Sequence, residues 1–274
     1  DRIKMWPTRS GASRPRPGGQ VMRTILLLCF VLLTPGVAWT QGLSDRIPPV
    51  ENECVVLVHG LNRGDGSLFL MERLLSAAGY QVVNLDYPSR SATIDKLVGY
   101  LADAVAACDD RTVNFITHSL GGILVRGWIG MNDRGNLGRV VMLAPPNQGS
   151  ELVDAMADLA LYRFITGPAG QQLGTDEEGG PARFGPVDFD LGVIAGDRSL
   201  NPVFSAMIPG EDDGAVSVKS TKVEGMADHV VLPVTHTLMM NNPLVIAQAM
   251  IFLQTGHFDH ALTYRELARR LTPK

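Results

Sequence analysis

The sequence predicts an α/β protein in which a mainly parallel sheet is covered by helices on both faces. Short apolar runs rich in β-branched residues alternate with segments whose apolar residues recur at helical spacing. The runs are almost continuously apolar, as in strands that are buried on both faces. Because right-handed crossovers bring the carboxyl ends of such strands to one edge of the sheet, the functional loops are expected there.

Six strands and four main helices are expected in chain order. The strands are residues 55–58, 81–85, 113–117, 140–143, 191–195 and 229–232. The helices are residues 68–78, 94–108, 121–129 and 244–253. Ser67 is a suitable N-cap for the first helix and Gly79 a suitable end. Asn242 and Pro243 are a suitable cap and first residue for the last helix.

Length, composition and charge narrow the class of protein. A chain of 274 residues can bury one substantial core, and 45% hydrophobic with 19% charged residues is typical of a globular protein. A formal net charge of −4 argues against a nucleic-acid partner, because binding phosphates requires a basic face. These values indicate a globular enzyme or a binding protein.

The amino-terminal region has the composition of an export signal. Residues 1–21 are rich in Arg, Pro, Gly and Ser, and we expect them to be disordered. Residues 22–40 combine a basic start, a short apolar run and small residues, which predicts a signal peptide cleaved after Ala38 or Thr40. A buried core helix and a retained membrane anchor are the alternatives. Met22 is then the expected natural start, with residues 1–21 translated upstream of it or added artificially.

Ser119 is the strongest candidate for a catalytic residue. It lies in Thr117-His118-Ser119-Leu120-Gly121-Gly122, between a predicted strand and a predicted helix. A serine at such a turn is held on a tight elbow above the sheet, where the helix N-terminus favours developing negative charge. Gly121 and Gly122 allow the strand and helix to approach closely, although Thr117 stands where a glycine is usual.

These motifs resemble those of α/β-hydrolases of the bacterial lipase and esterase kind. The resemblance rests on Val58-His59-Gly60-Leu61, on the elbow, and on Ala144-Pro145-Pro146-Asn147-Gln148-Gly149-Ser150. It runs from about residue 55 to about residue 253, and is specific for serine chemistry but not for a substrate. The resemblance implies an α/β-hydrolase catalytic domain over residues 41–274 that cleaves small-molecule or lipid carboxylic esters.

The resemblance also implies a histidine base, because a serine hydroxyl is a poor nucleophile at neutral pH. The family's chain order is Ser, acid, His. His236 follows the last predicted strand and precedes the last core helix, where the family has its base. His229, His257 and His260 are the alternatives.

The acid is expected in the segment 211–217, which resembles the family's Asp-Gly-x-Val motif. Asp213 holds the matching position. Asp212 is the main rival, and Asp197 and Asp228 are further alternatives.

Two backbone amides are expected to bind the oxyanion, those of Leu61 and Leu120. His59 precedes the first of them; it could be a second base or a metal ligand, but a His-Gly pair here more often shapes the loop. The spacing of His, Asp and Glu predicts no metal site, and no cofactor is expected.

Residues 150–190 depart from the regular alternation. An apolar helical stretch is followed by a segment rich in Gly and Pro, which favours a small cap over Ser119 with an apolar wall for an acyl chain. Ordinary core is the alternative. Such a wall would also allow contact with a membrane surface.

Two other activities remain open. A thioesterase or acyltransferase would use the same three residues, and a non-catalytic relative would bind a partner instead. Dehalogenases and epoxide hydrolases are disfavoured because they need an aspartate at position 119.

After signal removal only Cys54 and Cys108 remain. In the implied fold they precede neighbouring strands at the end away from the active site. An even cysteine count in an oxidising compartment favours a disulfide over two free thiols.

Overall fold

The computed structural model describes residues 50–176 and 180–272. The predicted disordered extension (1–21) and the predicted signal peptide (22–40) lie outside these residues.

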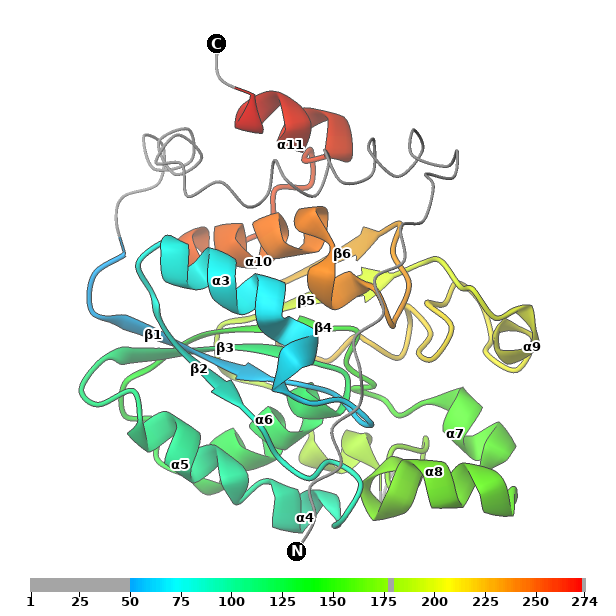
Figure 1. Ribbon diagram of the computed structural model, residues 1–274. Helices are drawn as coiled ribbons and strands as arrows, with labels where there is room; N and C mark the ends of the chain where they lie inside the picture. Colours follow the sequence, from blue (N-terminus) through cyan, green and yellow to red (C-terminus); the bar gives the residue numbers. More distant parts are fainter. Residues whose placement is uncertain (1–49, 177–179, 273–274) are drawn as a thin grey trace, which may run out of the picture. The chain divides into compact units, whose positions relative to one another are not determined.

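A six-stranded sheet forms the centre of the described chain, in the order β2-β1-β3-β4-β5-β6 (Figure 1). Each neighbouring pair of strands is parallel. The strands are β1 (Glu53–Val58), β2 (Gln81–Leu85), β3 (Thr112–His118), β4 (Leu137–Leu143), β5 (Leu191–Gly196) and β6 (Asp228–Leu232). The six strands predicted from the sequence are therefore confirmed, and their carboxyl ends meet at one edge.

Helices cover both faces of the sheet, as predicted (Figure 1). One face carries α4 (Ile94–Leu97), α5 (Tyr100–Ala106) and α6 (Leu120–Met131), and the other carries α3 (Phe69–Ala77) and α10 (Pro243–Thr255). Alternate residues of β1 belong to separate cores: Val56 and Val58 pack on the first face, Val55 and Leu57 on the second. This double burial explains why the strand is continuously apolar.

Shorter elements lie mainly in the connections between strands. They are η1 (Asp65–Leu68), α7 (Glu151–Met156), α8 (Ala160–Gln171), η2 (Pro181–Phe184), α9 (Pro202–Ser205), η3 (Met239–Asn241) and the C-terminal α11 (Tyr264–Leu271). Among the described residues, none of the helices has the length and apolar character needed to cross a membrane.

The first helix differs from the prediction at its start. It begins as the 3₁₀ turn η1 and continues as α3, and Ser67 does not cap it. The Ser67 hydroxyl instead donates to the Gly64 carbonyl at 2.7 Å. Gly79 follows the helix with φ 101°, as the expected end requires.

The predicted helix 94–108 is divided into α4 and α5. Leu101 and Ala102 donate to the carbonyls of Val98 and Gly99, three residues back, so the chain tightens between the two helices. The start of α10 agrees with the prediction. The Asn242 side chain accepts from the amides of Leu244 and Val245, and Pro243 is in the first turn.

Cys54 and Cys108 form a disulfide with a Cα–Cα distance of 5.6 Å. Both side chains are fully buried. β1 pairs directly with β3, and the bridge lies at the amino ends of these strands. The disulfide predicted from the sequence is confirmed, at the end of the sheet opposite Ser119.

Candidate active site

Ser119 occupies a strained turn between β3 and α6. Its φ of 52° and ψ of −120° are uncommon for a residue with a side chain. The Ser119 amide donates to the Leu143 carbonyl of β4 at 2.9 Å, which fixes the turn against the next strand. A Cβ atom at Gly121 would lie 2.4 Å from the Val58 carbonyl oxygen, so only glycine fits there.

Thr117 replaces the usual glycine without crowding the elbow. It is completely buried, and its Oγ1 lies 3.2 Å from the position that a Cβ of Gly122 would occupy. The space that the threonine needs is therefore provided by the absent side chain of Gly122.

His236 and Asp213 are directly hydrogen-bonded. His236 Nδ1 lies 2.8 Å from Asp213 Oδ2. Asp213 Oδ1 accepts from the amides of Ala215 and Val216 at 3.0 and 2.9 Å, and its side chain is 1% exposed. Because a carboxylate accepts at Nδ1, the Nε2 of His236 is left to take a proton.

The loop of His236 lies against the elbow through His118. His118 Nε2 is 3.0 Å from the His236 carbonyl oxygen, and the two ring centroids are 4.7 Å apart. The structure thus brings together His236, Asp213 and the residue that precedes Ser119. The Ser119 hydroxyl itself makes no hydrogen bond to His236 in the described part of the chain, and such bonds often tighten only when substrate is bound.

His118 is a neutral residue that was not predicted from the sequence. Burial, followed by the charge of His236, lowers the pKa of His118 well below its usual range. Since a carbonyl accepts at Nε2, the proton is on that nitrogen, and Nδ1 is buried without a partner. His118 therefore orients the His236 loop, and its only sequence signal is its position before Ser119.

The rival acids have other partners. Asp212 Oδ1 accepts from the Ser205 hydroxyl at 2.8 Å and from the Gly214 amide at 2.7 Å. Asp197 lies 3.2 Å from the Arg198 guanidinium.

The rival histidines also lie in other contacts. His229 Nε2 is 2.9 Å from the Thr221 hydroxyl, and His260 Nε2 is 2.9 Å from Asp228. The His257 amide donates to Thr255 in the loop after α10. Within residues 50–176 and 180–272, no group of three or more His, Cys, Asp or Glu residues could hold a metal ion.

The turn after β1 runs beside Ser119. A Cβ atom at Gly60 would lie 3.1 Å from Ser119 Cβ and 2.7 Å from His118 Nδ1. The amides of Leu61 and Leu120 donate to no other group of the described chain. Both N–H groups are thus available to a ligand beside the serine.

His59 shapes this turn from inside the protein. Its ring stacks on Tyr87 with centroids 4.2 Å apart, and the Tyr87 hydroxyl donates to the His59 carbonyl at 2.6 Å. His59 Nδ1 lies 2.9 Å from the Gly60 carbonyl, and burial lowers the pKa of His59. A fully buried ring with these contacts holds the backbone rather than serving as a second base.

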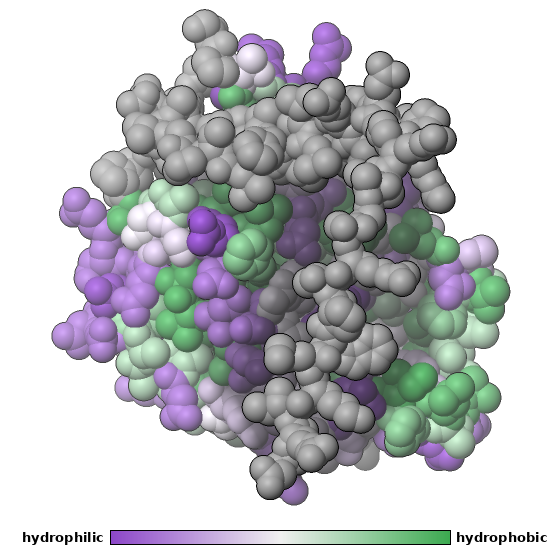
Figure 2. Space-filling model, viewed as in Figure 1, coloured by the Kyte–Doolittle hydropathy of each residue, from purple (hydrophilic) through white to green (hydrophobic). Residues whose placement is uncertain are grey.

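The segment predicted as a cap forms α7 and α8 beside this turn. A Cβ atom at Gly170 would lie 2.8 Å from Leu61 Cδ2, so the second half of α8 packs on the turn. The first half exposes apolar side chains, and Figure 2 shows an apolar area at the lower right, where Figure 1 has α7 and α8. The exposed residues are Leu159, directly before α8, and Leu161, Phe164 and Ile165 within it.

The sequence of the chain matches a known protein family. The model of the alpha/beta hydrolase family matches residues 55–269. No curated protein matches the chain in sequence.

Among solved structures, the chain is similar to the mature lipase BlEst2 of Bacillus licheniformis, with a TM-score of 0.62 and 21% identity over 77% of this chain and 96% of that one. It covers 52% of the propeptide form of the same lipase. It is also similar to the phospholipase PlaB of Legionella pneumophila (TM-score 0.60, 18% identity, 80% of this chain and 63% of that one). The metagenomic carboxyl esterase MGS0156 gives a TM-score of 0.59 at 18% identity, over 80% of this chain and 75% of that one.

Proposed function

Because the chain belongs to the alpha/beta hydrolase family, we propose that it is a serine hydrolase that cleaves carboxylic esters through an acyl-enzyme on Ser119. The observation that carries this proposal is the 2.8 Å hydrogen bond between His236 and Asp213, on loops held against the elbow by His118. A paired imidazole and carboxylate beside a strained serine is the arrangement that nucleophilic catalysis needs.

The proposed reaction begins with proton transfer from Ser119 Oγ to His236 Nε2. Oγ then bonds to the ester carbonyl carbon, and the carbonyl oxygen becomes an oxyanion that accepts from the amides of Leu61 and Leu120. Collapse breaks the bond to the alcohol oxygen, which takes the proton from His236. Water attacks the acyl-enzyme by the same route and releases the acid. Asp213 stabilises the imidazolium in both halves.

A fluorophosphonate probe tests the nucleophile, and a panel of p-nitrophenyl esters tests the reaction. The wild-type protein should be labelled and should hydrolyse at least one ester, whereas Ser119→Ala should lose both properties with an unchanged circular dichroism spectrum. Ser76→Ala, on the exposed side of α3, is the matched control and should keep both.

Other outcomes assign the alternatives. A labelled Ser119→Ala variant would mean that another residue is the nucleophile. A folded wild-type protein with neither labelling nor turnover would be a binding protein. Faster turnover of a thioester than of the ester with the same acyl group would make it a thioesterase.

We also propose that the protein is exported. The signal-like segment 22–40 lies outside the described residues, and the Cys54–Cys108 disulfide supports the proposal because such bridges persist in oxidising compartments. Expression from Met22 followed by amino-terminal sequencing of the exported protein tests it. A mature chain that still begins at Met22 would contradict cleavage.

A further inference from the structure

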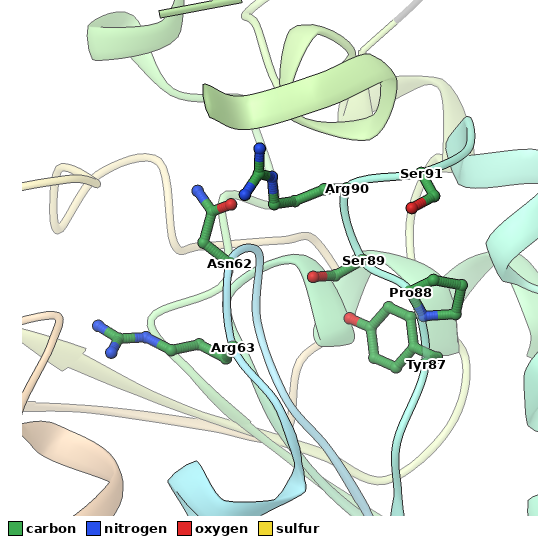
Figure 3. Close-up of a pocket in the computed structure, with 7 residues that line it drawn as sticks. All are labelled: Asn62, Arg63, Tyr87, Pro88, Ser89, Arg90 and Ser91. Atoms are coloured by element: carbon green, nitrogen blue, oxygen red, sulfur yellow. The ribbon is translucent and has the colours of Figure 1, made fainter. Parts of the chain in front are cut away.

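A cavity of about 330 Å³ lies beside the turn that carries Leu61 (Figure 3). Its lining comes from two loops, residues 62–63 after β1 and residues 87–91 after β2. These strands are parallel neighbours, so both loops leave the sheet at the edge that also carries Ser119. The volume is at the lower end of the range for small-molecule sites, and the mechanism proposed above uses none of the lining residues.

Two arginines, Arg63 and Arg90, are among the lining residues, and no acidic residue is. In Figure 3 their guanidinium groups extend in different directions from the two loops. Neither Arg63 nor Arg90 forms an ion pair with a carboxylate of the described chain. Arg90 Nη2 donates to the carbonyl of Phe164 in α8 at 3.3 Å, which is a neutral acceptor. The positive charge of both side chains is therefore available to a ligand.

The nearest acidic residues of these loops are directed elsewhere. Asp86 lies 3.6 Å from His59 Nε2, and its side chain is 73% exposed. Asp65 Oδ1 accepts from the amide of Gly66 at 2.7 Å. Neither of these residues is among the lining residues, whose formal charge is positive.

Arg63 also connects the cavity to the catalytic centre. Its charge is one of the causes, after burial and the charge of His236, that lower the pKa of His118. Arg63 also follows the turn whose Gly60 lies beside Ser119, so an anion at Arg63 would be near the bond that is cleaved.

Ser89 supplies a second, independent indication of a ligand. The residue is only 4% exposed, and its amide donates to the Tyr87 carbonyl at 2.8 Å. Its hydroxyl has no partner among the described residues. In Figure 3 this hydroxyl faces the same space as the Asn62 amide and the Arg90 guanidinium. This unpartnered hydroxyl is available to donate a hydrogen bond to an occupant of the cavity.

We propose that this cavity binds an anionic group, phosphate or carboxylate, on the ester that is cleaved at Ser119. Arginine matches both groups with parallel N–H donors, and Ser89 and Asn62 add neutral donors. The inference rests on the proposed ester hydrolysis and narrows it to esters that carry a negative charge near the scissile bond.

A matched pair of soluble esters tests this specificity: 1-butyrylglycerol 3-phosphate and uncharged 1-butyrylglycerol. The wild type should have at least about ten-fold higher kcat/KM for the phosphorylated ester, with the preference falling as salt is raised. Arg63→Gln with Arg90→Gln should remove most of this ratio through a higher KM. Arg73→Gln on α3, whose guanidinium lies over the Phe69 ring, is the matched control and should keep the ratio.

Vesicles distinguish the two sources of the anion. Faster release from phosphatidic acid vesicles than from the soluble phosphorylated ester would assign the anion to a lipid headgroup, and the reverse order to a soluble substrate. Either result supports the inference when the Arg63 and Arg90 substitutions abolish the preference for the charged ester. Equal ratios in the wild type and the double variant overturn it.

A binding measurement keeps this test separate from that of the proposed function. Glycerol 3-phosphate at ten times its Kd should raise the melting temperature of the wild type by about 3–6 °C, and should not raise that of the double variant. If neither ester is hydrolysed, the proposed function fails, and the melting shift alone tests whether the cavity binds an anion. An identical shift in both proteins, or none in the wild type, refutes the anion site.

Discussion

Replacing Gly121 by alanine tests how closely α6 must approach β1 at the elbow. The added Cβ would lie 2.4 Å from the Val58 carbonyl oxygen and 2.8 Å from that of His59. Both are backbone atoms in or directly after a strand with partners on both sides, so they cannot turn away as a flexible side chain could. Overpacking of this kind costs about 1–3 kcal/mol, occasionally more.

The expected magnitude follows from the size of the domain. A change of 1 kcal/mol moves the melting temperature by about 2–4 °C in a domain of this length, so Gly121→Ala should lower it by about 2–12 °C. The variant should also lose fluorophosphonate labelling, because relief of the contact displaces Ser119.

Gly130→Ala in the same helix is the matched control. A Cβ at Gly130 would meet no atom within 4 Å, so the substitution should stabilise by about 0.4–1 kcal/mol, a rise of about 1–4 °C. The assay is thermal unfolding followed by circular dichroism, with probe labelling at 25 °C. The close-approach argument is refuted when Gly121→Ala melts at or above the wild-type temperature, or when Gly130→Ala loses as much stability.

Three further outcomes are expected. Asp213→Asn should reduce kcat/KM by about 10³–10⁴-fold, and Asp212→Asn by less than about ten-fold. The reverse order in steady-state kinetics would make Asp212 the acid. The Cys54–Cys108 bridge has a sequence separation of 54, for which chain entropy allows a stabilisation of at most about 4 kcal/mol. Dithiothreitol should therefore lower the melting temperature by up to about 8–16 °C. Two free thiols in the denatured, unreduced protein would contradict the bridge. Burial lowers the pKa of His229 to about 4, so the unfolded chain binds a proton that the folded chain does not, and stability should fall as pH falls from about 6.5 to 4. His229→Gln should flatten this part of the stability curve, and melting curves with an unchanged slope would exclude the histidine as its cause.

The strands were predictable because a strand that is buried on both faces is apolar at consecutive positions. The strand Gln81–Leu85 was predicted to its ends, and the α/β-hydrolase fold implied by the motifs is confirmed by the family match. β4 begins three residues earlier than expected, at Leu137, where the chain is less apolar. Its start is set by pairing, since the Arg139 amide donates to the Asn114 side chain of β3 at 2.8 Å, and such contacts leave no periodic pattern.

The contacts around the candidate site depend on residues far apart in sequence. Arg126 was not singled out, yet it is 4% exposed and donates from Nη1 to the backbone and side-chain oxygens of Asn147 at 3.0 Å. Its Nη2 donates to the Gly185 carbonyl at 2.6 Å, and burial lowers the pKa of Arg126 to about 10. An arginine within an apolar helix has no local signal for these partners, just as His118 has none for the His236 carbonyl.

The strained turns at the carboxyl ends of β3 and β4 are each stabilised by the next strand of the sheet. Ser119 and Ala144 follow β3 and β4 directly, with φ of 52° and 45°. Ser119 donates its amide to Leu143 of β4 at 2.9 Å, and Ala144 donates to Ile194 of β5 at 2.8 Å. Conformations of this kind cost of order 1–3 kcal/mol and persist only where the surroundings hold them. Because each turn is held by the strand beyond it, a substitution that destabilises β5 is expected to displace Ser119 through β4, without a direct contact to the loops of Asp213 or His236.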